Sequence, residues 1–398
     1  MTSPQLRRAL VLSTLWPNAS APRFGTFVAR SIEALARHTD WQPVVINPIG
    51  LPPLALGRYR EAKHAAVDGE ENGIAIHRPT FRLLPKVGGR LNPRLIAKAV
   101  MPLARRLHEE QPFDLVDAQF FYPDGPAAAR IAAELGLPLS IKARGADIHY
   151  WGGRKYGAHA LTSAASQAVG LLSVSEALAD DMAALGMDRS KITIHRTGLD
   201  RDRFRPLGHT QLRNRLGSEL GIEIGARDQL IATVGALIER KGQALVIKAI
   251  ADLPDARLLL VGKGEDEASL RALARSEGVA DRVHFLGSLD HDLLPLVLSA
   301  ADVMALPSAS EGLANAWIEA LACGTPVVIT DAGGAREVVN TPAAGVIVAR
   351  RTDAVREGIR LVLQNRRPPL EVAACVEAYS WEANGKALGA HYDRLIAG

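Results

Sequence analysis

Short apolar runs alternate with amphipathic segments through most of this 398-residue chain, and that alternation restricts the fold more than any other feature. In the first half, the apolar runs are 8–16, 42–49, 113–121, 137–145, 168–175 and 190–198, and helix-like segments at 31–38, 123–136 and 176–186 separate them. Short runs of this kind between helices are typical of parallel strands that are buried on both faces. The first half is therefore predicted to form a parallel sheet with right-handed crossover helices.

The second half repeats the pattern, with apolar runs at 229–237, 256–264, 282–287, 301–308, 325–330 and 344–349 and helix-like segments at 242–253, 267–278, 291–300 and 315–324. A chain of this length is too long for one ordinary core. We expect two doubly wound α/β domains that face each other, at residues 1–206 and 207–378, with a last segment at 379–398. Ligands of such folds bind beyond the carboxyl ends of the strands, so the active site is expected in the cleft between the domains.

The composition, 47% hydrophobic and 23% charged, is that of a soluble globular protein. The two cysteines, Cys323 and Cys375, have no zinc-ligand spacing and indicate a reducing cytosol. No apolar run approaches the ~18 residues of a membrane-spanning helix. Arg7 and Arg8 precede an apolar stretch as in a signal peptide, but Pro17 ends that stretch early, and we interpret it as a first core strand.

A basic segment stands out within a net charge of +4. No acidic residue occurs from Asn72 to His108, and six cations recur there at four-residue intervals: Arg78, Arg82, Lys86, Arg90, Arg94 and Lys98. One interpretation is a solvated face, and the other is a surface that meets anionic lipid headgroups or a phosphorylated lipid. Nucleic acid is disfavoured as a partner, because no aromatic residues interleave with these cations and no recognition motif appears.

A second unusual segment, EGLANAWIEALACGTPVVIT at 311–330, keeps Glu319 in the middle of an otherwise apolar helix. Asn315 to Cys323 is predicted to be helical, and the N–H groups at the start of such a helix offer a site for phosphate. Glu311 would lie at the mouth of that site. The carboxylate of Glu319 would be stabilised by hydrogen bonds from a vicinal diol such as ribose, or alternatively by a structural ion pair with a distant arginine.

Two further elements fit the same kind of ligand. Arg240 and Lys241 follow the strand that ends at Gly235, where they are placed to neutralise a diphosphate. The segment 283–287, which includes His284, offers main-chain groups to a base edge.

In this order the segments resemble the nucleotide-sugar domain of the retaining glycosyltransferases of family 4, which have the GT-B fold. The first half agrees with that family at 22–36, 113–148, 173–186 and 196–206. The resemblance implies that residues 1–206 bind the acceptor and that residues 207–378 bind the nucleotide sugar. It also implies that the segment 379–398 forms a helix that crosses back to the first domain.

The resemblance assigns roles to individual residues. Glu311 matches the first glutamate of the family's E-x7-E signature, beside the donor sugar, and Glu319 matches the ribose-binding glutamate. Lys241 matches the phosphate-binding lysine, and Gly25 matches the glycine that closes over the diphosphate. The loop whose N–H groups approach the sugar and diphosphate corresponds to Gly312, Leu313, Ala314 and Asn315.

Two positions depart from the family pattern. Ala236 stands where many relatives carry an arginine, and Arg240 is the candidate to supply that charge. Arg144 stands where many relatives have a histidine beside the reacting carbon, followed by Asp147 and His149, as in a subgroup with an Arg-Gly-x-Asp element. We take Arg144, Asp147 and Glu311 as the candidate catalytic residues, with a structural role open for Arg144, Asp147 and His149.

The implied reaction moves a sugar from a nucleotide diphosphate sugar to a glycan or polyprenyl-linked glycan, with no cofactor and no metal. The acids of the DHD segment, Asp290 and Asp292, are interpreted as helix caps and not as metal ligands. The expected location is the cytoplasm, including the inner face of the membrane. The alternatives are a nucleotide-sugar 2-epimerase, a non-catalytic nucleotide-sugar-binding protein and a dinucleotide oxidoreductase, which VGKGED at 261–266 matches incompletely.

Overall fold

A computed structural model describes residues 6–22, 24–54, 56–83, 88–225, 227–289 and 292–397. The chain divides into two compact units. The first contains the residues up to Gly198 together with Trp381 and the residues after it, and the second contains Leu199–Ser380. The division therefore follows Gly198, earlier in the chain than the boundary expected after residue 206, and the last helix begins at Trp381.

The first unit is built on an eight-stranded sheet in the order β10-β9-β8-β7-β1-β2-β5-β4. All of its neighbouring strands are parallel except β4, which pairs antiparallel with β5. Its strands are β1 (Arg7–Leu12), β2 (Trp41–Ile46), β4 (Gly69–Glu71), β5 (Ile74–His77), β7 (Leu115–Ala118), β8 (Leu139–Ala143), β9 (Gly170–Ser173) and β10 (Ile192–Ile194); β3 (Ile49–Leu51) and β6 (Thr80–Arg82) form a separate pair.

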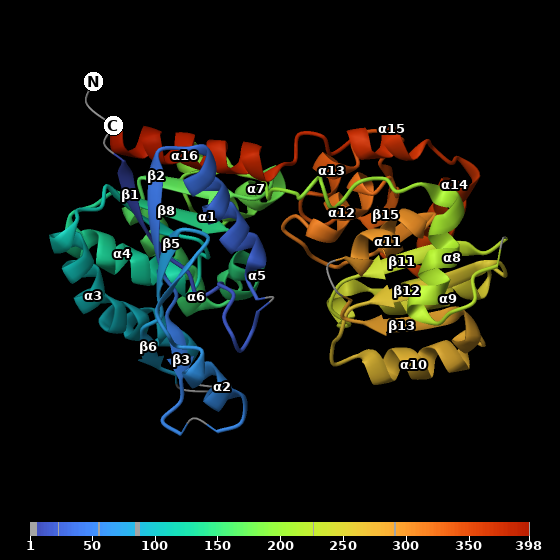
Figure 1. Ribbon diagram of the computed structural model, residues 1–398, viewed down its shortest axis with the longest axis horizontal. Helices are drawn as coiled ribbons and strands as arrows, with labels where there is room; N and C mark the ends of the chain where they lie inside the picture. Colours follow the sequence, from blue (N-terminus) through green and yellow to red (C-terminus); the bar gives the residue numbers. More distant parts are fainter. Residues whose placement is uncertain are drawn as a thin grey trace. The chain divides into compact units, whose positions relative to one another are not determined.

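Helices cover both faces of this sheet (Figure 1). α1 (Thr26–His38) packs on α16 (Trp381–Ala397), whose Leu388 and Tyr392 enter the same core as Ile32 and Leu35. On the other side, α4 (Asp124–Leu135) packs on β7 and β8 and contacts α3 (Asn92–Glu110) and α6 (Lys155–Gln167). The remaining helices of this unit are α2 (Arg58–His64), α5 (Ala146–Gly152) and α7 (Glu176–Ala184), with 3-10 turns η1 (Gly88–Arg90) and η2 (Arg189–Lys191).

The last helix is held in the first unit by polar contacts as well as by its apolar face. Asn384 accepts a hydrogen bond from Ser31 Oγ at 2.6 Å, and Asp393 accepts one from Trp41 Nε1 at 2.8 Å. His195 Nε2 lies 2.9 Å from the carbonyl oxygen of Asn384. The C-terminal segment therefore completes the core that the N-terminal residues begin.

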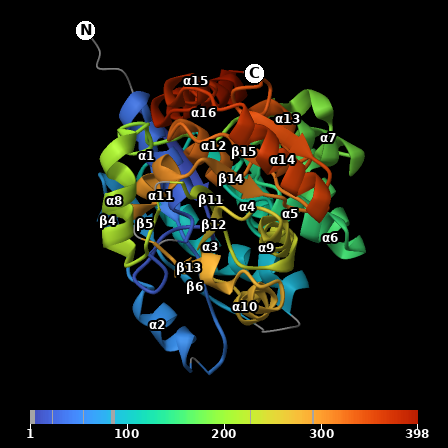
Figure 2. The same ribbon diagram turned by 90° about the vertical axis from the view of Figure 1, so that its right-hand side faces the viewer.

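The second unit has a six-stranded parallel sheet in the order β13-β12-β11-β14-β15-β16. Its strands are β11 (Gln229–Val234), β12 (Ala256–Val261), β13 (Val283–Gly287), β14 (Val303–Leu306), β15 (Val327–Thr330) and β16 (Gly345–Val348). α9 (Gln243–Ala251), α10 (Glu267–Ser276) and α14 (Thr352–Gln364) share one core with the sheet, and α9 and α10 lie side by side in both views (Figure 1, Figure 2).

The remaining elements of the second unit are α8 (His209–Leu220), α11 (Leu293–Ala300), α12 (Asn315–Ala322), α13 (Ala335–Val338), α15 (Pro369–Ala374) and the turns η3 (Glu239–Lys241) and η4 (Ala280–Arg282). α11 contacts both α8 and α12. Each strand predicted from the apolar runs is present, and the parallel, doubly wound α/β organisation is confirmed in both units. In each sheet the strand order reverses direction at one place, between β1 and β7 and between β11 and β14, where ligands of such folds bind.

Candidate active site

The loops after β11 and β14 meet at the point where the strand order of the second sheet reverses. Lys241 Nζ lies 2.5 Å from Glu311 Oε1, and Arg240 Nη1 lies 3.5 Å from Glu311 Oε2. The main chain joins the same loops, because Ala309 N–H donates to the carbonyl oxygen of Arg240 at 2.7 Å. The structure thus brings together Arg240, Lys241 and Glu311, which were predicted from separate segments. Glu311 is nearly buried and holds both cations at the carboxyl edge of the sheet.

Two glycines allow these loops to approach so closely. Gly242 has φ 75°, and a Cβ on it would lie 2.4 Å from the carbonyl oxygen of Pro307. Gly333, with φ 53°, would place a Cβ 2.2 Å from the carbonyl oxygen of Glu311. Any side chain at either position would push the backbone of the 307–314 loop away, so glycine is required. Neither glycine was singled out from the sequence, because the contact partner lies far along the chain.

Arg350 is a further residue that the sequence analysis missed. Its Nε donates to the carbonyl oxygen of Pro307 at 3.1 Å, and its Nη2 donates to that of Glu239 at 2.8 Å. Since Pro307 begins one loop and Glu239 belongs to the other, Arg350 ties the two together from the end of β16. It therefore acts as a positioning residue for Lys241 and Glu311.

The loop from Gly312 to Ala314 leads directly into α12, which begins at Asn315 as predicted. Ala314 occupies the N-cap position and no side chain caps the helix. Gly334 N–H donates to the carbonyl oxygen of Gly312 at 2.8 Å, and Leu313 and Ala314 are buried. The N-terminus of α12 is thus fixed at the carboxyl edge of the sheet, where its dipole favours an anion.

Glu319 lies in the second turn of α12 and is only partly accessible. Burial raises the pKa of its carboxyl group to about 7, and no neighbouring charge or hydrogen bond opposes that shift. Within the described part of the chain, no side chain or main-chain group forms a hydrogen bond or ion pair with this carboxyl group. The structural ion pair considered from the sequence is therefore not formed by the described residues.

His284 does not join this group, which corrects the prediction that it binds the donor. It is the second residue of β13, and the charged groups that affect it are Arg257, Asp228 and Asp281. Asp228 directly precedes β11 and Arg257 is the second residue of β12, so these groups belong to the amino-terminal halves of the strands. The loops that carry Lys241 and Glu311 leave the opposite ends. The prediction failed because the sequence of a short strand does not show which end of the sheet a given side chain lies nearest.

The carboxyl edge of the first sheet carries the other predicted residues. Gly25 is the N-cap of α1 and has φ 74°, and a Cβ on it would lie 2.5 Å from the carbonyl carbon of Leu15. The guanidinium of Arg144 lies over the ring of Phe27, 4.8 Å from its centroid, in the first turn of α1. The Gly25 turn and the Arg144 turn are therefore neighbours within the first unit.

Arg144 is held by two side-chain bonds and one main-chain bond. Its Nε donates to the carbonyl oxygen of Gln119 and its Nη2 to Gln119 Oε1, both at 2.7 Å. Its backbone N–H donates to Asp147 Oδ1 at 3.0 Å. Burial lowers the pKa of Arg144 to about 10, so the group remains charged at neutral pH. These bonds leave Nη1 as the edge of the guanidinium that Gln119 does not engage.

Asp147 is fully buried and bonds to the main chain. Besides the Arg144 N–H, its Oδ2 accepts the N–H of Phe121 at 2.8 Å. Burial raises the pKa of this carboxyl, while those two N–H bonds and Arg144 oppose the rise. Asp147 therefore positions the Arg144 turn and does not reach a substrate itself. The side chain of His149 also has a partner within the protein, since its Nε2 lies 2.9 Å from Asp181 Oδ2.

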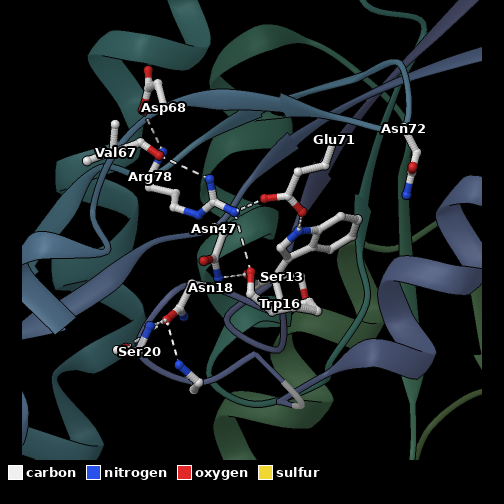
Figure 3. A network of polar contacts seen from close by, with 12 residues as sticks. Ser13, Trp16, Asn18, Ser20, Asn47, Val67, Asp68, Glu71, Asn72 and Arg78 are labelled. Carbon is white, nitrogen blue, oxygen red and sulfur yellow. Dashed lines mark hydrogen bonds and ion pairs between the residues drawn. The ribbon is translucent and has the colours of Figure 1, made fainter. Parts of the chain in front are cut away.

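Arg78 is buried, which corrects the prediction that it faces a membrane or an acceptor. Figure 3 shows its guanidinium beside Glu71, whose other oxygen accepts a hydrogen bond from Trp16 Nε1 at 3.3 Å. Arg78 Nη1 donates to the carbonyl oxygen of Val67 at 3.0 Å, and its backbone N–H donates to Asp68 at 2.8 Å. Arg78 follows β5 directly, so the strand carries it into the interior instead of along a surface stripe.

The other predicted cations that the structure describes are exposed: Arg82, Arg90, Arg94 and Lys98. Arg94 and Lys98 lie one turn apart on α3, whose opposite side buries Ile96, Ala97 and Val100. The four-residue spacing thus reflects the solvent face of a helix there. Lys86 lies outside the described residues.

Neither a metal-binding cluster nor a membrane-spanning helix is found among the described residues. Asp292 is the N-cap of α11 and lies 3.3 Å from Arg203 Nη2, while Asp290 lies outside the described residues. Across the described ranges, no three His, Cys, Asp or Glu side chains are grouped to hold a metal ion. In the same ranges, none of the helices combines the length and apolar character needed to cross a bilayer.

Two family models match the chain one after the other. The glycosyltransferase family 4 model matches residues 24–203, and the glycosyl transferases group 1 model matches residues 222–378. The chain is 27% identical over 360 residues to the putative teichuronic acid biosynthesis glycosyltransferase TuaC of Bacillus subtilis, covering 88% of each chain. It is 35% identical over 218 residues to the D-inositol 3-phosphate glycosyltransferase of Mycobacteroides abscessus. That match covers 53% of this chain and spans only about half, 48%, of the relative.

A solved structure agrees with these matches in fold. The Anabaena protein HepE in complex with UDP superimposes with a TM-score of 0.73 at 19% identity, covering 98% of this chain and all of the other. Both units, both family models and this likeness point to the same assignment. The chain belongs to the family 4 glycosyltransferases and has the GT-B fold.

Proposed function

We propose that this protein transfers a sugar from a nucleotide diphosphate sugar to a hydroxyl group, with retention of the anomeric configuration. The observation that carries the proposal is the carboxyl group of Glu319, which lies in the helix that follows the Lys241–Glu311 pair and has no partner among the described residues. A ribose diol would donate two hydrogen bonds to it, and the diphosphate would meet Lys241, Arg240 and the N-terminus of α12. The complex of HepE with UDP supports a nucleotide of this type.

The reaction needs charge stabilisation more than it needs acid–base groups. As the bond to the diphosphate breaks, negative charge grows on the leaving oxygens, and fixed cations and N–H dipoles stabilise it without reorganisation. Glu311 holds Lys241 and Arg240 in place before the donor arrives. In a retaining reaction on one face of the sugar, the leaving phosphate oxygen accepts the proton of the incoming hydroxyl. Arg144 is the proposed group of the first unit that faces the transferred sugar.

The donor is tested by a thermal-shift screen of the protein with UDP, GDP, ADP and their sugars. A bound ligand raises the melting temperature in proportion to the logarithm of its concentration over Kd. We expect a response to one nucleotide and to its sugars, and a strongly reduced response in Lys241→Ala. Lys248→Ala, an exposed lysine of α9, is the matched control. A Lys241→Ala protein with unchanged nucleotide affinity would contradict the proposed diphosphate site.

The acceptor is proposed to be a glycan, including one linked to a lipid on the inner face of the membrane. In the same unit as the exposed cations of α3 and β6, the segment before α2 exposes Leu54 by 78% and Leu56 by 64%. Apolar side chains next to exposed lysine and arginine residues are typical of a surface that enters the headgroup region of a bilayer. The segments belong together, because α2 packs on β3, β3 pairs with β6, and β6 contacts α3.

Membrane binding is tested by flotation with anionic and neutral liposomes at low salt. The variant Arg82→Glu, Arg94→Glu, Lys98→Glu should lose binding to anionic vesicles, since each cation contributes about 1 kcal/mol near such a surface. A control variant with charge reversals in the second unit, Lys248→Glu and Arg275→Glu, should bind the vesicles as the wild type does. Equal flotation with neutral and anionic vesicles would remove the electrostatic part of the proposal.

A non-catalytic nucleotide-sugar-binding protein is the alternative that a specific position favours, because Ala236 replaces the arginine of many relatives. Slow hydrolysis of the donor without an acceptor would support an enzyme. Nucleotide binding without hydrolysis, and without transfer to any acceptor tried, would support the alternative. The same donor-only incubation separates a 2-epimerase, which would change the sugar and leave the nucleotide attached.

A further inference from the structure

Several aromatic side chains of the first unit form a cluster around Trp151, which lies in the segment after β8. The ring of Trp151 lies 4.2 Å from that of Tyr122, 5.0 Å from that of Tyr150 and 6.0 Å from that of Tyr156, measured between centroids. α5, which carries Tyr150 and Trp151, begins at the carboxyl edge of the sheet, directly after the Arg144 turn. Tyr150 is 56% exposed and Trp151 is partly exposed, so the cluster presents aromatic surface to solvent.

The turn η1 is fastened to this cluster. Tyr122, which is buried, donates from its hydroxyl to the carbonyl oxygen of Gly89 at 2.6 Å. Burial raises the pKa of Tyr122 to about 12, so the hydroxyl keeps the proton that this bond requires. Gly89 rests on the indole, since a Cβ there would lie 3.0 Å from Cη2 of Trp151. Arg90, the next residue, is thereby carried to the rim of the cluster.

Two guanidinium groups lie on the same rings. Arg154 lies 4.3 Å from the centroid of Tyr150 and 5.8 Å from that of Trp151, and its Nη2 donates to the Tyr150 hydroxyl at 2.7 Å. Arg90 lies 6.0 Å from the centroid of Tyr156. In the part of the chain that the structure describes, neither arginine forms an ion pair with a carboxylate. Exposed arginines elsewhere in this unit, such as Arg105 and Arg189, do pair with acids.

Partly exposed rings, flanked by two arginines that pair with no described carboxylate, form a surface of defined chemistry. The flat apolar face of a pyranose stacks on an aromatic ring, and a carboxylate or phosphate on that sugar meets the fork of an arginine. The rings also hold the two guanidinium groups in fixed positions, which reduces the entropy lost when an anion binds. α5 connects these rings to the Arg144 turn, which lies at the sheet edge where ligands of this fold bind.

We propose that Tyr150, Trp151, Tyr156, Arg90 and Arg154 form an acceptor subsite for a sugar that carries a negative charge. This inference rests on the proposed glycosyl transfer and names the chemical class of its acceptor. The charge is a carboxylate, as in a uronic acid, or a phosphate ester, and the two share the same recognition by arginine.

Binding is tested by titrating the full-length protein with methyl glucuronide, glucose 6-phosphate and methyl glucoside, following tryptophan fluorescence. Trp16, Trp41 and Trp317 are buried and Trp381 is partly accessible, so the difference between the wild type and Trp151→Phe is used to identify the signal of Trp151. The two anionic sugars are expected to bind at least about tenfold more tightly than the neutral one, because only they accept charge-assisted hydrogen bonds from the two arginines. Whichever anionic sugar binds more tightly identifies the carboxylate or the phosphate.

Arg154→Ala and Arg90→Ala should each lower the affinity for the anionic sugar about tenfold and leave that for methyl glucoside unchanged. Arg130→Ala, an exposed arginine of α4, is the matched control. Equal affinities for charged and neutral sugars, no binding of any of the three, or unchanged binding in both variants would each overturn the subsite. Nucleotide binding measured on the same protein separates the two ideas. A protein that binds nucleotide and no anionic sugar refutes the subsite alone, and the reverse result refutes the proposed donor.

Discussion

The two sheets reverse their strand order in the same way, but the loops at the two reversal points are joined by different chemistry. In the first unit, Asp124, at the start of α4, accepts the N–H of Thr14 in the loop after β1 at 2.8 Å. In the second unit, Lys241 in the loop after β11 pairs with Glu311 in the loop after β14. The first junction is therefore a buried carboxyl bonded to the main chain, and the second is a cation–acid pair with a nearly buried carboxylate.

Each junction also has a carboxyl group with a pKa of about 7, and the causes differ. For Asp124, burial raises the pKa, its two bonds from Thr14 oppose the rise, and the nearby Asp147 adds to it. For Glu319, burial alone raises the pKa. Oδ2 of Asp124 accepts the bond from Thr14, although its Oδ1 has no partner among the described residues, whereas neither oxygen of Glu319 bonds to a described residue. Under the proposed function a ligand completes the second edge, and three experiments test this difference between the two junctions.

The largest expected effect is on nucleotide affinity. Glu319→Ala should weaken binding of the nucleotide sugar about 100-fold, because two hydrogen bonds to a charged carboxylate are lost. Isothermal titration calorimetry measures the affinity, and Glu277→Ala, an exposed acid after α10, is the control. Glu319→Gln should unfold at the same denaturant concentration as the wild type or a higher one. Full nucleotide affinity in Glu319→Ala would contradict the comparison.

The next effect is on the stability of the first unit. Asp124→Ala should reduce the free energy of unfolding by about 2–3 kcal/mol, because it leaves the N–H of Thr14 without its acceptor. Asp124→Asn keeps an oxygen in place and should cost less than half as much. Urea unfolding followed by circular dichroism measures both, with the exposed Asp180→Ala as the control. An Asp124→Ala protein as stable as the wild type would show that the carboxyl is not needed at this junction.

The smallest effect is a dependence on pH. Glu319 accepts hydrogen bonds as a carboxylate, and in the free protein it takes up a proton as the pH falls through about 7. Nucleotide-sugar affinity should therefore be constant above pH 7 and fall up to tenfold per pH unit below it, which is ~1.4 kcal/mol. In the ligand-free protein, the raised pKa makes the free energy of unfolding depend on pH in the opposite direction. Stability contributed by the neutral form is present at the ordinary carboxyl pKa of 4.5 and is lost as the pH rises to about 7.

Calorimetry between pH 5.5 and 8 measures the affinity, and urea unfolding over pH 4.5 to 8 measures the stability. Asp124 contributes to the stability profile as well, so the difference between wild type and Glu319→Gln isolates the second unit. A wild-type affinity that does not change between pH 5.5 and 8 would indicate that Glu319 does not meet the ligand.

Much of the fold followed from local pattern, since short apolar strands between amphipathic helices have few ways to bury both faces. The apolar pattern did not predict elements in which the strands are short or in which a helix carries many charged residues. The antiparallel pair β4 and β5 and the long helix α3 were not predicted, although the spacing of Arg94 and Lys98 was the exposed face of that helix. In the candidate site, Arg240 and Lys241 do contact Glu311, while the ligand-binding roles of Glu311 and Glu319 stay predictions.

By itself, the sequence determined the two α/β units, the helix that carries Glu319 and the segments that bring Lys241 and Glu311 to one sheet edge. Only the tertiary structure decided that Arg78 is buried on Glu71, that His284 serves the other end of its strand and that Asp147 bonds to the main chain. Periodicity records which face of an element is buried. The partner of a polar group depends on contacts between distant segments, and those exist only once the chain is folded.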